Sequence, residues 1–205
     1  LQNPTKAGFT FEGWYTTSDF LGSKVTQITK GSTGNKTFYA KWTANANTHN
    51  ITYTAQGTGW TYGNSNPTTA EEGATVTFVV NPTAGYSVSV SSDGPALTGP
   101  NGSNQYTFTM PTKDVKITVE AEPKQYTVTL NKQSGTGGPS SVTATYAAAM
   151  PTITPPTRTG YTFNGYFDAT SGGTKYYNAN GSSAKSWDKT ADATLYAQWT
   201  ANKYT

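Results

Sequence analysis

The sequence contains one motif twice. Residues 160–167 read Gly-Tyr-Thr-Phe-Asn-Gly-Tyr-Phe, and residues 8–15 read Gly-Phe-Thr-Phe-Glu-Gly-Trp-Tyr. A second shared string follows each copy, at residues 37–45 and 194–202. The first match has an offset of 152 residues and the second an offset of 157, so the later copy contains five more residues between its two strings. Internal repetition of this kind predicts an array of small modules rather than one large domain.

Each copy of the motif has the composition of a strand bracketed by turns. Aromatic and β-branched residues favour a pleated, half-buried surface. Simple alternation places Tyr161, Phe163 and Gly165 on one face of the strand and Tyr166 on the other. The missing side chain of Gly165 predicts a β-bulge or the close approach of another backbone or ring. We expect these aromatic residues to form a core; an aromatic platform for a sugar ring is the alternative.

The repeat divides the chain into modules. Residues 1–45 are a partial copy, which has no counterpart of residues 126–154. Residues 51–122 form a different module, residues 124–202 are the complete copy, and residues 203–205 resemble the start of a further repeat. A sheet that lacks strands exposes unpaired backbone edges. We therefore expect the partial copy to be stabilised by packing on its neighbour or by a partner chain; a chain boundary that falls inside a repeat is the equal alternative.

The middle module has five segments rich in β-formers, separated by turn residues such as Asn81-Pro82 and Asp93-Gly94-Pro95. In the last segment Val115, Ile117 and Val119 share one face, and polar residues lie between them. This is the alternation of an antiparallel sheet with one face in solvent. The sequence predicts an antiparallel sheet or a sandwich-like module here, within a mainly β chain.

Composition excludes several classes of protein. There is no cysteine, so neither disulfides nor thiolate metal sites can form. No apolar run approaches the length of a membrane span. Net charge alternates along the chain, with +3 over residues 1–49, −4 over 50–122 and +4 over 123–205. Because no basic cluster resembles a phosphate-tracking stripe, we expect no nucleic-acid partner. No signal peptide is visible, and the chain does not begin with Met.

Catalytic chemistry is not indicated. The only histidine, His49, falls in a small polar linker predicted over residues 44–50, so no Ser-His-Asp arrangement is built around it. No metal-ligand spacing is present, and we expect no metal and no cofactor. A glycosidase needs two carboxylates that flank a sugar. Asp168, Asp188 and Asp192 are the acids that could converge around the longer segment of the complete copy, between residues 167 and 194. The sequence predicts a protein that is not an enzyme.

Two aromatic residues of the middle module are candidates for ligand binding. Trp60 and Tyr62 lie among Gly and Asn in a long connection. If the two rings are exposed together, they form a patch that could face a carbohydrate or a receptor.

The repeated strings resemble a known family. Residues 156–167, 194–199 and 126–131 are similar to the Listeria–Bacteroides repeat, the internalin-type B-repeat family. Tyr166-Phe167 departs from the Trp-Tyr usual in that family, and a polar-rich insertion replaces the usual middle segment. Residues 51–122 more loosely resemble the divergent bacterial surface repeats that accompany it. The resemblance implies a β-grasp-like fold for the outer modules, a place in large secreted or wall-anchored bacterial proteins, and no catalytic residues.

These observations predict a non-catalytic repeat region of an extracellular bacterial protein, at the cell surface or secreted, that acts as a stalk or spacer and in adhesion or protein interaction. Expected partners are neighbouring repeats of the same chain and a host or cell-surface protein or glycan, with no membrane insertion in this segment. Two alternatives stay open: a carbohydrate- or receptor-binding module that uses Trp60 and Tyr62, and an accessory region of a secreted glycan-active enzyme.

Overall fold

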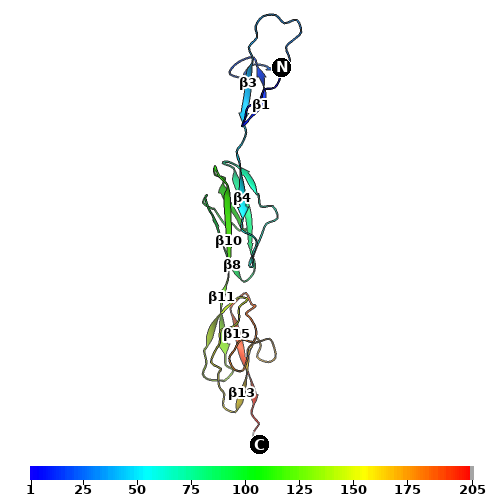
Figure 1. The fold of residues 1–205 in the computed structure, drawn as a ribbon. Coiled ribbons are helices and arrows are strands. Elements are labelled where there is room, and N and C mark those ends of the chain that lie inside the picture. The colour runs from blue at the N-terminus through cyan, green and yellow to red at the C-terminus, as the bar shows by residue number, and fades with distance from the viewer. Residues whose placement is uncertain (204–205) are drawn as a thin grey trace.

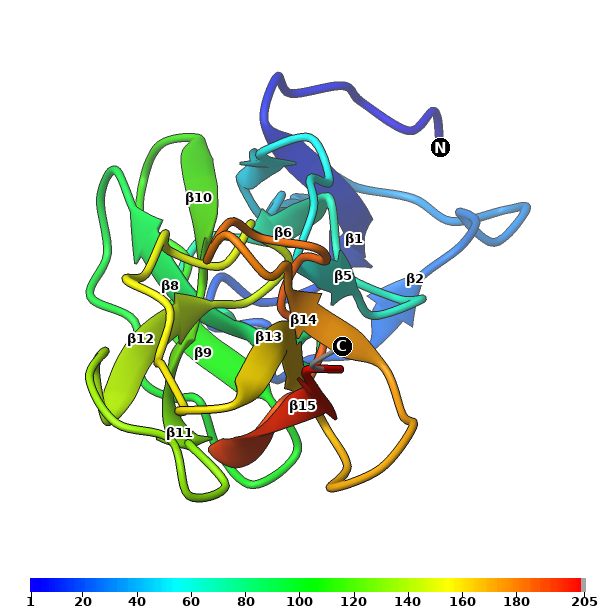
Figure 2. The ribbon, with the colours of Figure 1, turned by 90° about the horizontal axis from the view of Figure 1, so that it is seen from below.

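A computed structural model describes residues 1–203. In Figure 1 the chain forms three β-sheet bodies that follow one another along a single long axis, with the N-terminus at one end and the C-terminal residues at the other. Over the described range the regular elements are all strands, so the predicted mainly β class is correct. Viewed from below in Figure 2, the strands of the three bodies overlap one another. Within residues 1–203 no helix is long and apolar enough to span a membrane. The predicted start of a further repeat, apart from Lys203, lies outside the described residues.

The partial copy forms a three-stranded antiparallel sheet. Strands β1 (Phe9–Tyr15), β2 (Lys24–Val25) and β3 (Tyr39–Ala44) lie in the order β2-β1-β3. Both hydrophobic core clusters of the described residues lie elsewhere, and no side chain of this copy belongs to them. The copy stands apart from the middle module in Figure 1. Packing on a neighbouring module, one of the two supports expected from the sequence, is therefore not found.

The middle module is a sandwich of two sheets. One sheet has the order β6-β4-β10-β8 and the other β5-β7-β9. Residues from both sheets, among them Phe78, Val80, Ile117 and Val119, form one buried cluster between them. The strands are β4 (Thr48–Tyr53), β5 (Trp60–Tyr62), β6 (Thr69–Glu71), β7 (Thr75–Pro82), β8 (Tyr86–Ser92), β9 (Gln105–Thr109) and β10 (Val115–Pro123). The predicted inward face of β10 is correct, since Val115, Ile117 and Val119 are all buried.

The complete copy is one five-stranded mixed sheet with the order β12-β11-β15-β13-β14. Its strands are β11 (Gln125–Asn131), β12 (Ser141–Thr145), β13 (Tyr161–Phe167), β14 (Lys175–Tyr177) and β15 (Ala193–Ala201). The central pair, β11 and β15, is parallel, and the other pairs are antiparallel. This arrangement fits the β-grasp-like fold expected for the outer modules. Leu195 and Ala197 of β15 lie in the core, and Tyr176, Tyr177 and Trp187 from the segment between β13 and β15 complete it.

A bulge in the repeated motif changes the predicted faces of β13. The register shifts between Phe163, opposite Trp199, and Gly165, opposite Gln198, so Asn164 has no direct partner. An extra residue inverts the alternation beyond it. As a result Phe163 and Tyr166 are both buried, although simple alternation placed them on opposite faces. The same shift occurs in the first copy between Phe11 and Gly13.

His49 lies in a strand rather than in the expected linker. Strand β4 begins at Thr48, and His49 pairs with Ala70 of β6. Its imidazole Nδ1 lies 4.0 Å from a carboxylate oxygen of Asp114, and its side chain is about one-fifth exposed. The small polar residues of this segment give no β signal, so the sequence alone predicts a linker there. Pairing with β6 supplies the order that the local sequence lacks.

Candidate functional surfaces

Trp60 and Tyr62 do not form an exposed pair. Trp60 is only 3% exposed and belongs to the core of the sandwich. Tyr62 is partly buried against it, with ring centroids 4.7 Å apart, and donates its hydroxyl hydrogen bond to the carbonyl of Thr54 at 2.8 Å. The exposure on which the expected ligand patch depended is therefore absent. Trp60 instead belongs to the core of the sandwich, and Tyr62 packs against it.

The acids of the insertion are used one by one in local structure. Asp168 accepts a hydrogen bond from the backbone N–H of Thr174 at 2.7 Å and pairs with Lys189 at 3.2 Å. Asp192 accepts from the backbone N–H of Thr127 at 2.8 Å, which fixes the start of β11. Each carboxylate therefore has its own structural partners. Within residues 1–203 there is also no group of three His, Asp or Glu side chains that could hold a metal ion.

Asp188 is held in its charged form. It pairs with Lys185 at 2.5 Å and accepts the hydroxyl hydrogen bond of Tyr176 at 2.5 Å. These two contacts, the lysine first, lower the pKa of Asp188, and the hydrogen bond from Thr174 lowers the pKa of Asp168. A glycosidase acid requires the opposite shift, because it must carry a proton at neutral pH.

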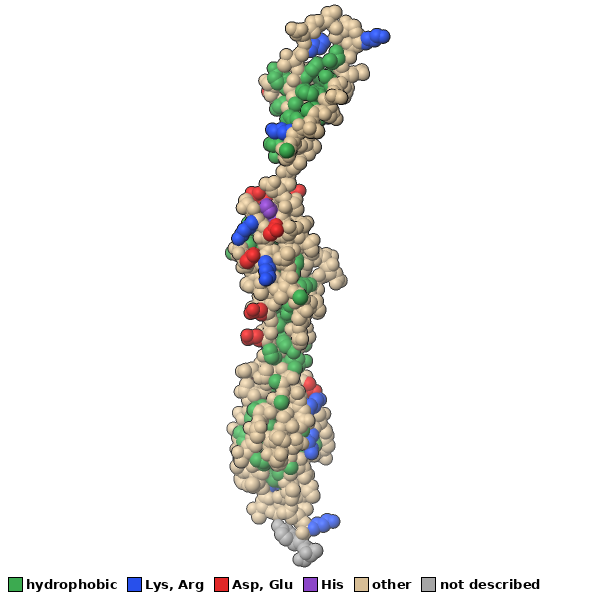
Figure 3. All heavy atoms as spheres, in the orientation of Figure 1, with side chains coloured by type: hydrophobic (Ala, Val, Ile, Leu, Met, Phe, Trp, Pro, Cys, Tyr) green, Lys and Arg blue, Asp and Glu red, His purple; other side chains and the backbone are tan. Residues whose placement is uncertain are grey.

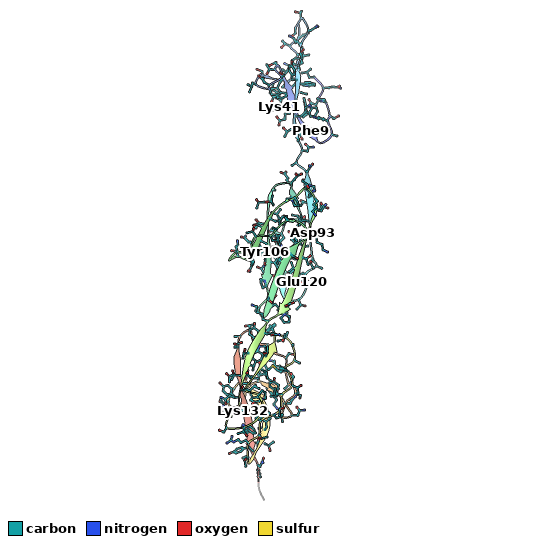
Figure 4. The ribbon with its side chains drawn as sticks, turned by 90° about the vertical axis from the view of Figure 1, so that its left-hand side faces the viewer. Phe9, Lys41, Asp93, Tyr106, Glu120 and Lys132 are labelled. Atoms are coloured by element: carbon teal, nitrogen blue, oxygen red, sulfur yellow. The ribbon has the colours of Figure 1, made fainter. Side chains whose placement is uncertain are left out.

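Surface charge is dispersed along the molecule. Figure 3 shows acidic side chains spaced along the middle module and single basic side chains on the outer modules. Figure 4 places Asp93 and Glu120 on the middle module, Lys41 on the first copy and Lys132 on the complete copy. Asp93 accepts a hydrogen bond from the backbone N–H of Lys116 at 2.9 Å. On the face of residues 1–203 that Figure 3 shows, the two signs of charge are interspersed on the middle module, and no strong single-sign patch is seen.

The joint between the middle module and the complete copy is hydrogen-bonded to both modules. One residue, Lys124, separates β10 from β11. Its N–H donates to the carbonyl of Gly85 in the middle module at 2.8 Å, and its carbonyl accepts from the N–H of Tyr146 in the complete copy at 2.9 Å. The rings of Tyr86 and Tyr146 meet edge to face across the joint at 5.5 Å. Gly85 has a φ of +86°, and a Cβ there would lie 2.5 Å from the Tyr146 ring, so only glycine permits this contact.

The joint between the first copy and the middle module is built differently. Asn45 is fixed to the first copy, since its N–H donates to the carbonyl of Gly8 at 2.8 Å and its side chain accepts from Thr10 at 2.7 Å. Asn47 is fixed to the middle module, because its carbonyl accepts from the N–H of Glu72 at 2.8 Å. Ala46 lies between these two anchors and makes none of these bonds. We therefore expect the chain to pivot at this residue more freely than at Lys124.

The first copy presents an open aromatic cluster. Phe11 lies 5.6 Å from Trp14 and 5.3 Å from Trp42 between ring centroids, both edge to face. In the complete copy Phe163 makes the same two contacts, at 5.3 Å with Tyr166 and 5.2 Å with Trp199. There Phe163 and Tyr166 are buried, whereas Phe11 and Trp14 remain half-exposed. A half-open pocket of about 320 Å³ lies beside them, lined by residues that include Glu12, Lys24 and Val25.

The two joints and the open cluster were not identified from the sequence. One signal for the second joint is present in the sequence: the predicted middle module ends at residue 122 and the predicted complete copy begins at residue 124. So short a connection indicates nearly continuous strands. Its partners Gly85 and Tyr146 are 61 residues apart in sequence, and no local pattern pairs them.

Comparison with known proteins agrees with this architecture. The Listeria–Bacteroides repeat domain matches residues 1–41 and 126–198, which together exceed half of the chain. The chain belongs to this family. The divergent InlB B-repeat domain matches residues 49–125 between them. Internalin H of Listeria monocytogenes serovar 1/2a is 33% identical over 93 residues, which are 45% of this chain and 16% of that protein. The match therefore spans a small part of this relative.

Proposed function

We propose that residues 1–203 form a stalk of a bacterial surface or secreted protein, in which B-type repeats act as a spacer and carry no catalytic site. The similarity to Internalin H and to two B-repeat families supports a repeat region of a surface protein. The end-to-end order of the modules in Figure 1 supports a spacer, because each module adds length rather than thickness. Adhesion or interaction with a host or cell-surface partner is the role that such a spacer serves.

The observation that carries the proposal is the joint at Lys124. Two backbone hydrogen bonds and an aromatic pair hold two modules in a fixed relation. Each such hydrogen bond contributes about 1 kcal/mol net, and an edge-to-face pair about 0.5–1.5 kcal/mol. A fixed relation between neighbouring modules is what keeps a stalk extended, so this joint supports the proposal.

Small-angle X-ray scattering on residues 1–205 tests the proposal. We expect an extended particle whose maximum dimension approaches the length of the molecule in Figure 1. The profile should also require a fixed pair formed by the middle module and the complete copy. A profile fitted only by three freely jointed beads would contradict the stalk. The matched control is Tyr146→Ala, which removes the aromatic contact and leaves the backbone bonds in place.

A further inference from the structure

Strands β8 and β12 belong to different modules but lie along the same side of one long strand. Strands β10 and β11 follow one another down the axis of the molecule, with Lys124 between them (Figure 1). The N–H of Lys124 donates to Gly85, the residue before β8, and its C=O accepts from Tyr146, the residue after β12. A residue in an antiparallel strand directs its N–H and its C=O to the same side. Strands β8 and β12 therefore lie end to end along residues 117–129.

The two strands together make one composite edge that crosses the joint. Both run antiparallel to their neighbour, so β12 leads into β8 along the edge. Opposite Lys124, Tyr146 supplies the N–H and Gly85 the C=O that a single residue of an unbroken strand would supply. The alternation of hydrogen-bonded residues therefore continues through the joint without a break. The residues that direct their N–H and C=O away from β10 and β11 are Ser141, Thr143, Thr145, Tyr86, Val88, Val90 and Ser92.

The composite edge is unprotected, unlike the other outer strands of these two modules. Strands β5, β6 and β14 have only three residues each, and β9 is hydrogen-bonded on its free side to Thr98. Strands β8 and β12 contain no charged residue and no proline, and their pairing with β10 and β11 shows no bulge. Short strands, charges, proline and bulges are the devices that keep a sheet edge from pairing with another chain. The composite edge has none of these devices and is long enough to pair.

We propose that the composite edge pairs antiparallel with the same edge of a second copy of the chain. A two-fold axis at Tyr86 sets β8 of each copy against β12 of the other, which pairs both strands along their whole length. In this register Val90 of one copy lies opposite Thr143 of the other, and Val88 lies opposite Thr145. The outward N–H and C=O groups of the two edges then supply each other's hydrogen bonds, in the mode of strand addition.

The distribution of charge favours a second copy in this orientation. Antiparallel pairing places the middle module of each copy beside the complete copy of the other. Residues 50–122 carry a net charge of −4 and residues 123–205 a net charge of +4, so each module meets one of opposite sign. Pairing of β8 with β8 alone would set two modules of charge −4 side by side. Val88 and Val90 are only half-buried at this edge of the sandwich, and the second copy covers them.

Sedimentation equilibrium of residues 1–205 and of the variant Thr143→Pro tests the proposal. Thr143 is exposed and directs its N–H away from β11, so proline removes a hydrogen bond of the new pairing and none of the fold. We expect the mass of the parent chain to rise from 21.8 kDa toward twice that value between about 1 µM and about 1 mM, and the Kd of the variant to be at least about tenfold higher. The matched control, Thr143→Ala, keeps the N–H and should dimerise like the parent.

Amide hydrogen exchange of the unmodified chain gives a second readout, which does not depend on the folding of a variant. As concentration rises, exchange should slow at least about tenfold at both Val90 and Thr143, because both amides gain hydrogen-bond partners. Added salt should weaken the dimer, since opposite charges face each other across it.

Four results would overturn the inference. The first is a chain that stays monomeric at about 1 mM, which would leave the edge free or assign it to another protein. The second is protection of β8 without protection of β12, which would assign the dimer to β8 alone. The third is a dimer that salt does not weaken. The fourth is a Thr143→Pro variant that unfolds in urea like the parent and still dimerises as tightly.

Discussion

Replacing Gly165 by alanine tests the account of the repeated motif. Gly165 has a φ of +127°, a conformation that residues with a side chain rarely adopt. An added Cβ would also overlap the carbonyl oxygen of Tyr177 and lie 3.3 Å from its carbonyl carbon. Tyr177 is completely buried, with its hydroxyl bonded to the carbonyl of Pro151, so strand β14 cannot move away freely. Backbone strain costs about 1–3 kcal/mol and displacement of a packed strand a similar amount, so we expect a loss of about 2–6 kcal/mol.

The matched control is Gly137→Ala in the hairpin connection of the same module. Gly137 also has a positive φ, of +71°, but no atom lies within 4 Å of an added Cβ. This variant should lose only about 1–2 kcal/mol, from backbone strain. Urea unfolding, followed through the amide resonances of β15, gives both values. If Gly165→Ala costs no more than Gly137→Ala, the close approach of β14 is not the reason for this glycine.

Three further predictions concern the joint, an unpaired hydroxyl and pH. Tyr146→Ala should leave the modules folded but let them tumble with different rotational correlation times in ¹⁵N relaxation, because a contact of about 0.5–1.5 kcal/mol is lost. The hydroxyl of Tyr166 is buried without a hydrogen-bond partner within the described residues. Tyr166→Phe should therefore raise the free energy of unfolding by about 1 kcal/mol in urea, and a loss of stability would reveal a hidden partner. Contacts lower the pKa values of Asp168 and Asp188 in the fold, so the stability that they add is present above the ordinary value of 3.8 and is lost as pH falls below it. Burial raises the pKa of Tyr177 from 10.0 to about 12, so its contribution is present below pH 10.0 and is lost as pH rises toward 12. The urea midpoint should therefore be constant between pH 3.8 and pH 10.0 and should fall at lower and at higher pH. A fall between pH 5 and 9 would contradict the assignment of the pH dependence to these aspartates and to Tyr177.

The repeat made the outer modules predictable. Two strings at nearly the same spacing identified equivalent strands, and the residues shared by the copies do form the same contacts. Thr10 with Asn45 and Thr162 with Asn202 make the same side-chain hydrogen bond, each at 2.7 Å. Strands of strict alternation, such as β10, were also predicted correctly, because their period alone fixes which face is buried.

Other features could not be predicted because they depend on tertiary partners. The glycine of the motif indicated a bulge, but the sequence did not show that the bulge turns Tyr166 into the core. Trp60 lies in a segment rich in glycine, which gives no sign of burial. In the structure it is buried in a core formed by residues of both sheets of the sandwich. His49 gains its order from pairing with β6, about 20 residues away. Local sequence reports period and turn chemistry, whereas these placements depend on strands that are distant in sequence.

The central claim is that one joint is fixed while the other pivots. Double electron–electron resonance, which measures the distance between two spin labels, tests it most directly. Because the sequence has no native cysteine, labels attach only at the two introduced cysteines. Labels at Glu120→Cys and Thr143→Cys span the joint at Lys124, and labels at Ala44→Cys and Glu120→Cys span the joint at Ala46; all three positions are exposed. The account predicts a narrow distance distribution across Lys124 and a broader one across Ala46. A broad distribution across Lys124, as wide as that across Ala46, would contradict it.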